Sequence, residues 1–162
     1  MRQGIAGYKD IRQSTGDCPF MTGDCRQGTA DDLIIPSHIF NDMLAHCRQG
    51  YPNEVCGILA GRDNRVSKLY RMANTENSPV NYMMDSKEQF KVMKDMRENS
   101  LSMVAIYHSH PASPPYPSQT DMNLAFYDDA VYIIISLIED KPVVKAYNIR
   151  GKVEEEVDIS VE

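Results

Sequence analysis

The run of residues 131–138 (VYIIISLI) constrains the fold more than any other part of the chain. It is rich in β-branched residues, which favour extended backbone, and it shows little alternation between apolar and polar positions. A strand with one face in water would show that alternation clearly. The run therefore predicts a strand that is buried on both faces, in a sheet that helices cover.

Helical and extended patterns alternate along the chain from residue 33 onward. Ser37 is placed to cap a helix that Gly50 ends, while Ser86 and Gln89 have capping-box spacing at the start of a second helix. The apolar stripe of this second helix comprises Phe90, Met93 and Met96. A third helix is expected at residues 118–128, and strands are expected at residues 34–35, 54–61, 66–72, 102–107, 131–138, 143–148 and 153–159.

The length of 162 residues and this order of elements predict a single domain. Helices and strands are interleaved rather than segregated, which is typical of an α/β or mixed α+β fold with helices packed on a mixed sheet. We place this domain at residues 31–162.

Residues 1–30 differ from the rest of the chain. They contain the sequence TGDC twice, at residues 15–18 and 22–25, and they show neither a helical nor a strand period. We expect them to form a flexible, disordered leader. Cys18 and Cys25 are spaced so that they can bind a metal, but no histidine or further cysteine lies nearby to complete a site, so disorder is the favoured interpretation.

Composition excludes several classes of function. The formal net charge of −6 argues against a nucleic-acid partner, which would call for a basic face. No apolar window is long enough to span a membrane, and the N-terminus lacks the apolar core of a secretory signal. The spacing of the four cysteines does not indicate a disulfide-stapled fold. We therefore expect a cytoplasmic protein; the sequence does not indicate its oligomeric state.

The segment at residues 108–121 (HSHPASPPYPSQTD) carries the clearest chemical signal. His108 and His110 stand two residues apart on an expected strand, so both side chains point to one face and can reach one ion about 2 Å away. Pro111 cannot continue a sheet ladder, so the strand should end there. Ser118 and Asp121 would then lie on one side of the first turn of the following helix.

These residues predict a catalytic zinc site. His108, His110 and Asp121 supply three ligands to one Zn²⁺ per chain and leave the fourth tetrahedral position to a water molecule, which is the open arrangement of catalytic zinc. Zinc lowers the pKa of such a water from about 16 towards about 7. Glu54 is the candidate proton shuttle, and the Ser118 hydroxyl is the candidate donor to a developing oxyanion.

Each of these residues also has a structural interpretation. A lone H-x-H can be two ordinary strand residues, Ser118-x-x-Asp121 is also a helix-capping pattern, and Glu54 can be an exposed strand end. The complete spacing should arise by chance only on the order of once per thousand chains, which favours the functional interpretation. Among the other candidates, His38 and His46 are expected to be surface or hydrogen-bonded core groups, and Cys56 is expected in the core.

At these positions the chain resembles the JAMM/MPN+ (JAB1/MPN/Mov34-like) zinc metalloproteases. Their motif is a glutamate followed by H-(S/T)-H-P-x6-S-x-x-D. It is matched in full by Glu54, His108, Ser109, His110, Pro111, Ser118 and Asp121. The resemblance covers residues 33–148 and implies a curved mixed sheet between helices. It also implies zinc on His108, His110 and Asp121, with Glu54 as general acid/base and Ser118 as oxyanion stabiliser.

The short chain resembles the compact prokaryotic form of that family. Such members are associated with ubiquitin-like sulfur-carrier proteins, in which they cleave a peptide or isopeptide-like bond after the carrier's Gly-Gly tail. The resemblance therefore implies a protein or peptide substrate. Two alternatives remain open at this point: a zinc hydrolase of small peptides or cell-wall fragments, and a non-catalytic MPN scaffold or binding module.

Overall fold

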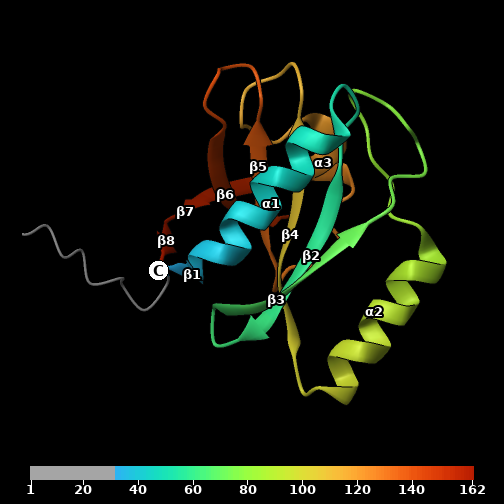
Figure 1. Ribbon diagram of the computed structural model, residues 1–162, viewed down its shortest axis with the longest axis vertical. Coiled ribbons are helices and arrows are strands. Elements are labelled where there is room, and N and C mark those ends of the chain that lie inside the picture. Colours follow the sequence, from blue (N-terminus) through green and yellow to red (C-terminus); the bar gives the residue numbers. More distant parts are fainter. Residues whose placement is uncertain (1–31) are drawn as a thin grey trace, which may run out of the picture.

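The computed structural model describes residues 32–162, which form one curved sheet with helices on both faces (Figure 1). The leader proposed at residues 1–30, including Cys18 and Cys25, lies outside the described residues. The helices are α1 (Ser37–Gly50), α2 (Ser86–Glu98) and α3 (Gln119–Asn123). The strands are β1 (Leu33–Ile35), β2 (Cys56–Arg62), β3 (Arg65–Met72), β4 (Ser102–His110), β5 (Val131–Ser136), β6 (Val143–Arg150), β7 (Val153–Val157) and β8 (Ile159–Val161).

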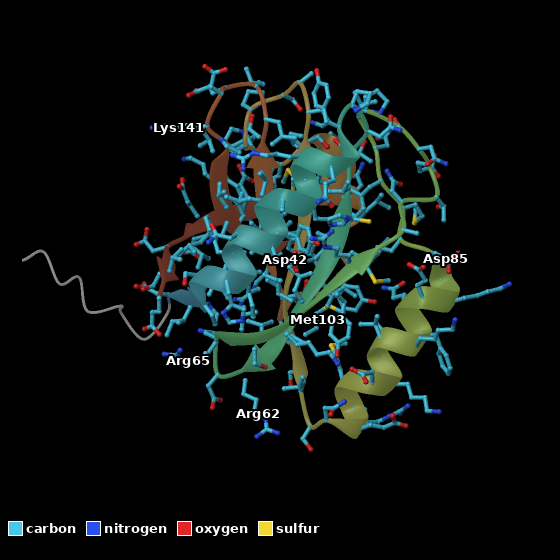
Figure 2. The ribbon with its side chains drawn as sticks, in the orientation of Figure 1. Asp42, Arg62, Arg65, Asp85, Met103 and Lys141 are labelled. Atoms are coloured by element: carbon cyan, nitrogen blue, oxygen red, sulfur yellow. The ribbon has the colours of Figure 1, made fainter. Side chains whose placement is uncertain are left out.

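The sheet is mixed, as the sequence predicts. Its strand order is β7-β6-β5-β4-β2-β3-β1-β8. The central strands β4 and β5 are parallel, and each pairs antiparallel with its other neighbour, β2 or β6. All six residues of β5 are buried, which confirms the predicted doubly buried strand for residues 131–136. The prediction is wrong for the last two residues, because the strand ends at Ser136 and Ile138 is 55% exposed. The two parallel strands therefore end at the same edge of the sheet, near the connection that carries Lys141 in Figure 2.

The two ends of the sheet are joined by the C-terminal segment. β7 pairs with β6 and β8 pairs with β1, yet only Asp158 separates β7 from β8. The Asp158 carbonyl accepts a hydrogen bond from the backbone N–H of Leu33 at 2.9 Å. The single strand predicted at residues 153–159 is therefore wrong: the chain changes partners at Asp158 because the sheet curls until both of its ends meet this segment (Figure 1).

Two apolar clusters form the core, one on each face of the sheet. α1 covers the first face and contributes Ile39, Met43 and Cys47. α2 lies against the second face and contributes Met96. In Figure 1, α1 crosses in front of the sheet while α2 stands beside β3 and β4. No helix within residues 32–162 is long and apolar enough to cross a membrane.

The predicted apolar stripe on α2 is only partly correct. Met96 is buried and Met93 packs against the core, but Phe90 is 66% exposed. At about 100° per residue, Phe90 lies about 120° around the helix from Met96, too far to share a narrow contact face. The contact face instead includes Val92.

The ends of the helices also differ from the predictions. α1 begins at Ser37 without a side-chain cap, because the preceding Pro36 occupies the cap position. α2 is capped by Asp85 rather than Ser86, since the Asp85 carboxylate accepts hydrogen bonds from two backbone N–H groups in the first turn. Figure 2 shows Asp85 at the start of this helix. The capping box predicted at Ser86 and Gln89 is therefore wrong.

The third helix is shorter than predicted. α3 ends at Asn123 instead of continuing to residue 128. The backbone N–H of Tyr127 donates to the Tyr132 hydroxyl at 3.0 Å, so it is not available for a helical bond to Asn123. The Phe126 N–H likewise bonds to the Leu124 carbonyl instead of to Met122, so the last helical bond is the one from Leu124 to Thr120. Spacing along the sequence could not reveal these contacts.

Candidate metal centre

The two histidines lie at the end of β4. Cys56 on β2 is opposite His108, and Ser136 on β5 is opposite His110. Alternation along the strand places both imidazoles on the face that α2 covers, in line with buried Ile106. Only 1% of His108 and 3% of His110 is exposed. The strand ends before Pro111, as predicted.

Ser118 and Asp121 form a capping box at the start of α3. The Ser118 hydroxyl accepts a hydrogen bond from the Asp121 backbone N–H at 3.1 Å, and the Asp121 Oδ2 accepts one from the Ser118 backbone N–H at 2.7 Å. The structural interpretation of this spacing is thus confirmed. A functional interpretation remains possible, because the second carboxylate oxygen, Oδ1, lies 3.2 Å from His108 Nε2 and a hydroxyl that accepts a hydrogen bond can still donate one.

Three side chains bring their ligand atoms together between β4 and α3. The two Nε2 atoms of His108 and His110 are 3.0 Å apart. Asp121 Oδ1 lies 3.2 Å from His108 Nε2, and Asp121 Oδ2 lies 3.4 Å from His110 Nε2. Zinc bonds of about 2.0–2.1 Å at tetrahedral angles place neighbouring ligand atoms about 3.3 Å apart, so the three side chains fit a zinc ion. One ligand atom from each of the three lies within 4.8 Å of the other two.

The surroundings orient the two rings differently. The Pro114 carbonyl lies 2.8 Å from Nδ1 of His110, and because a carbonyl only accepts, this contact places the proton on Nδ1 and leaves the Nε2 lone pair for a ligand bond. The ring of Tyr82 stacks on His108, with 4.6 Å between ring centroids. The Nδ1 atom of His108 is buried without a hydrogen-bond partner among residues 32–162.

Electrostatics keep Asp121 and His108 in the forms that bind metal, whereas they favour protonation of His110 in the metal-free site. Burial opposes ionisation of Asp121, but hydrogen bonds from His108 and His110 hold the pKa of its carboxyl well below its usual range. Burial lowers the pKa of His108. Burial also acts to lower the pKa of His110, but its contacts with Asp121 and the Pro114 carbonyl raise that pKa overall. Asp121 is therefore ionised and His108 neutral at neutral pH.

Glu54 lies two residues before β2 rather than inside the strand as predicted. The pairing with β4 nevertheless continues past the strand end. The Ser109 backbone N–H donates to the Val55 carbonyl at 3.0 Å, and the Val55 N–H donates to the Ser109 hydroxyl at 2.9 Å. Because Cys56 is opposite His108, this extension brings Glu54 opposite His110, where cross-strand side chains are neighbours.

Glu54 is buried, with 4% of the residue exposed. Burial raises the pKa of its carboxyl from the ordinary 4.5 to about 7; His110 opposes the shift and the Asp121 carboxylate adds to it. The pKa of the Glu54 carboxyl therefore depends on the charges of His110 and Asp121. A carboxyl with a pKa near neutrality suits proton transfer in either direction.

Of the other predicted candidates, His38 and His46 are not part of the cluster, while Cys56 lies opposite His108. Nδ1 of His46 is hydrogen-bonded to the Tyr107 hydroxyl at 2.7 Å, and His38 is exposed. Cys56 is fully buried in the core, as expected. Tyr82 and Pro114 were not predicted to contact the histidines, and no motif in the sequence marks them.

Residues 36–150 match the protein family described as prokaryotic homologs of the JAB domain, a span of more than half the chain. The chain belongs to this family. The chain is 43% identical over 113 residues to the CysO-cysteine peptidase of Mycobacterium tuberculosis. The aligned residues cover 68% of this chain and 77% of that protein. The chain is 41% identical over 90 residues to the desampylase of Pyrococcus furiosus, which covers 56% of this chain and 64% of that protein.

Solved structures agree with this assignment. A solution structure of a protein from Desulfitobacterium hafniense has 42% sequence identity and a TM-score of 0.72, covering 80% of this chain and 92% of that one. A JAB1/MPN domain protein from Archaeoglobus fulgidus shares the fold at 19% identity, with a TM-score of 0.53 over 80% of this chain and 98% of that one. The resemblance to the JAMM/MPN+ family and the predicted curved mixed sheet are both confirmed.

Proposed function

We propose that this JAB domain is a zinc-dependent metallopeptidase or isopeptidase that hydrolyses an amide bond. The observation that carries the proposal is the convergence of His108, His110 and Asp121, with their ligand atoms within 4.8 Å of one another and with Glu54 near enough for His110 and Asp121 to shift its pKa. A scaffold domain would have no need to bring two buried imidazoles together with a partly buried carboxylate, since removing polar and charged groups from water is costly.

His108, His110 and Asp121 are the residues that would hold the zinc. When bound, the ion supplies a Lewis acid that polarises the scissile carbonyl and makes water more acidic. Glu54 takes the proton from the attacking water and later delivers it to the leaving amine. Its carboxyl accepts and releases protons readily because the pKa is about 7. The Ser118 hydroxyl donates a hydrogen bond to the oxygen on which negative charge develops.

The proposed substrate is the C-terminal tail of a ubiquitin-like sulfur-carrier protein, or a conjugate of that tail, acted on in the cytoplasm. Support comes from the relatives, one a CysO-cysteine peptidase and another a desampylase. The compact prokaryotic members that this chain resembles act on such carriers. The partner is accordingly a protein, which agrees with the formal net charge of −6 and the lack of a basic character suited to nucleic acid.

The test combines metal analysis with a substrate panel. The purified protein should hold about one zinc per chain, and a chelator should abolish hydrolysis. Alanine at His108, His110 or Asp121 should empty the site, while His38→Ala, a histidine outside the cluster, should leave zinc content unchanged. Full zinc occupancy in all three ligand variants would reject the ligand assignment.

The panel should contain carrier-tail fusions, branched conjugates and free peptides. Cleavage of the fusions or conjugates after the carrier tail is the expected result. Cleavage of free peptides alone would replace the proposed substrate with a small peptide or cell-wall fragment. No cleavage of any member by the zinc-loaded protein would favour a scaffold.

A further inference from the structure

Glu54 is held through its main chain by the loop between β3 and α2. We refer to residues 74–84 as the 74–84 loop. The Glu54 backbone N–H donates to the Ser78 carbonyl at 2.8 Å, and the Glu54 carbonyl accepts from the Asn74 side-chain amide at 2.9 Å. Because Glu54 precedes β2, the strand itself does not fix this residue. The loop supplies the missing hydrogen bonds, and Figure 1 shows it beside the segment that leads into β2.

Asn74 joins Glu54 to a loop that is closed on itself. Its amide nitrogen donates a second hydrogen bond, to the Asn81 carbonyl at 3.1 Å. Its amide oxygen accepts hydrogen bonds from the backbone N–H groups of Glu76 and Met83, both at 3.0 Å. One planar side chain thus binds both ends of the loop and the Glu54 backbone. Among uncharged side chains, only a carboxamide combines two donors with a two-lone-pair acceptor.

The same loop contacts the candidate metal ligands. Tyr82 stacks on the His108 ring with 4.6 Å between ring centroids and 28° between ring planes. The loop therefore lies over the cluster on one side and holds the Glu54 backbone on the other. From this arrangement we propose that Asn74 is a positioning residue, which fixes the Glu54 carboxyl relative to the metal ligands through the Glu54 carbonyl. The inference rests on the proposed role of Glu54 as proton shuttle.

Three variants separate this role from general support of the loop. Asn74→Asp keeps the side-chain oxygen that accepts from Glu76 and Met83 but removes the donor to the Glu54 and Asn81 carbonyls. Asn74→Ala removes both functions. Thr75→Val is the matched control, because it deletes a side-chain hydrogen bond to the Met83 carbonyl that closes the loop without reaching Glu54. The Thr75 backbone N–H still donates to the same carbonyl at 2.9 Å.

We expect kcat of both Asn74 variants to fall by roughly 10-fold or more, since small misplacement of a catalytic group has effects of this size. KM and zinc content should stay within about two-fold of wild type, because the three ligands are unchanged and the proposed effect is on proton transfer rather than on binding. Thr75→Val should retain near wild-type kcat. An equal fall in kcat for Thr75→Val and the Asn74 variants would overturn the inference, because it would show only loosening of the loop.

A double-mutant cycle provides the decisive comparison. If Asn74 acts through Glu54, Asn74→Asp should change kcat by less than about two-fold once Glu54→Gln is present. A fall as large as in the wild-type background would mean that Asn74 acts independently of Glu54, and would overturn the inference.

Amide hydrogen exchange tests the hold of the 74–84 loop on Glu54 without activity. The Glu54 backbone N–H is bonded to the Ser78 carbonyl of this loop, so its exchange rate reports whether loss of the Asn74 contact frees Glu54 from the loop. In Asn74→Ala and Asn74→Asp, but not in Thr75→Val, the Glu54 backbone N–H should exchange at least about 10-fold faster than in wild type. Unchanged exchange in both Asn74 variants would refute the positioning role even in an active enzyme. A wild-type protein that cleaves no substrate would instead refute the proposed function, and the exchange rates would still decide whether Asn74 holds Glu54.

Discussion

The carboxyl of Glu54 lies where a charge is difficult to accommodate. It is 4% exposed, and its pKa is raised to about 7 first of all by burial. The surroundings thus favour the protonated form, while the adjacent His110 favours the ionised one. A proton shuttle needs this near balance, because it must accept and then release a proton at one pH.

The variant Glu54→Gln tests the shuttle directly. Glutamine keeps the size and shape of the side chain but cannot accept a proton, so turnover should fall by roughly 100-fold or more. Zinc content and substrate binding should remain normal, because the metal ligands are unchanged. Steady-state kinetics and metal analysis on the same preparation check both statements. Near-normal turnover would remove Glu54 from the mechanism.

The same variant should alter how stability depends on pH in the metal-free protein. The folded-state pKa of about 7 lies above the ordinary value of 4.5, so the native state holds a proton that the unfolded state has released. The free energy of unfolding of the wild type should therefore fall as pH rises from about 4.5 to about 7. Glutamine lacks this titration, so Glu54→Gln should gain up to roughly 3 kcal/mol relative to wild type over that range.

Urea unfolding of chelator-treated protein at pH 5 and pH 8 measures the effect. The difference in free energy of unfolding between variant and wild type should be larger at pH 8. A difference that is equal at the two pH values would show that Glu54 ionises in the folded protein as it does in the unfolded chain.

The residues that could be predicted at this scale are those whose positions follow from local periodicity. His108 and His110 share a face because side chains alternate along any strand. Pro114, Tyr82 and Asn74 could not be predicted, since their contacts depend on the path of a loop. Glu54 was identified by the motif, but the hydrogen bonds that hold its backbone come from the 74–84 loop.

At the scale of elements, one residue of the α3 N-terminus, Ser118, has both a structural role and a proposed catalytic role. Ser118 caps the helix through its hydroxyl oxygen, and its O–H is the proposed donor to the oxyanion. Ser118→Ala should therefore lower stability by about 1 kcal/mol through loss of the cap. It should also raise the activation barrier by about 3 kcal/mol through loss of the donor. Thermal unfolding and kcat measure the two effects separately.

Ser118→Thr serves as the control for that prediction. Threonine retains a hydroxyl that can both cap the helix and donate, so stability and kcat should stay close to wild type. If Ser118→Ala lost stability but retained full turnover, Ser118 would be a helix cap alone.

The sequence patterns located the elements better than their ends. Each of α1, α2 and α3 overlaps its predicted helix, because apolar spacing and proline position act locally. The ends depend on which group binds each backbone N–H. Asp85 rather than Ser86 caps α2, and beyond α3 the N–H groups of Phe126 and Tyr127 bond to the Leu124 carbonyl and the Tyr132 hydroxyl. The groups that bind these N–H groups come from tertiary contacts or from neighbouring residues that could cap equally well. Residue spacing alone does not show which group is used.

At the scale of the whole molecule, the sheet and its helices lie within residues 32–162, and the match to prokaryotic homologs of the JAB domain spans residues 36–150. We therefore predict that deletion of residues 1–30 leaves folding and activity nearly unchanged. The melting temperature should shift by less than about 2 °C, and kcat/KM should stay within about two-fold. Calorimetry and kinetics of the truncated protein check this. A large fall in either quantity would mean that residues 1–30 pack on the domain.

The fold class was predictable because one doubly buried strand, flanked by amphipathic helices, admits few arrangements. The change of partners at Asp158 was not predictable. An alternating pattern over residues 153–159 is the same whether the segment pairs with one strand or with two, so the sequence alone could not reveal that it joins both ends of the sheet.

The pairing of β8 with β1 limits when the sheet can be completed during folding. β1 lies at the beginning of the described residues and pairs in parallel with β8, where Ile35 is opposite Val161. Closing so long a stretch of chain has a high entropic cost before any contact offsets it, so this pairing belongs late in folding. During synthesis, β1 can contact β3 but must wait for β8 until Val161 has left the ribosome. The domain therefore reaches its final form only once that residue is free to pair with β1.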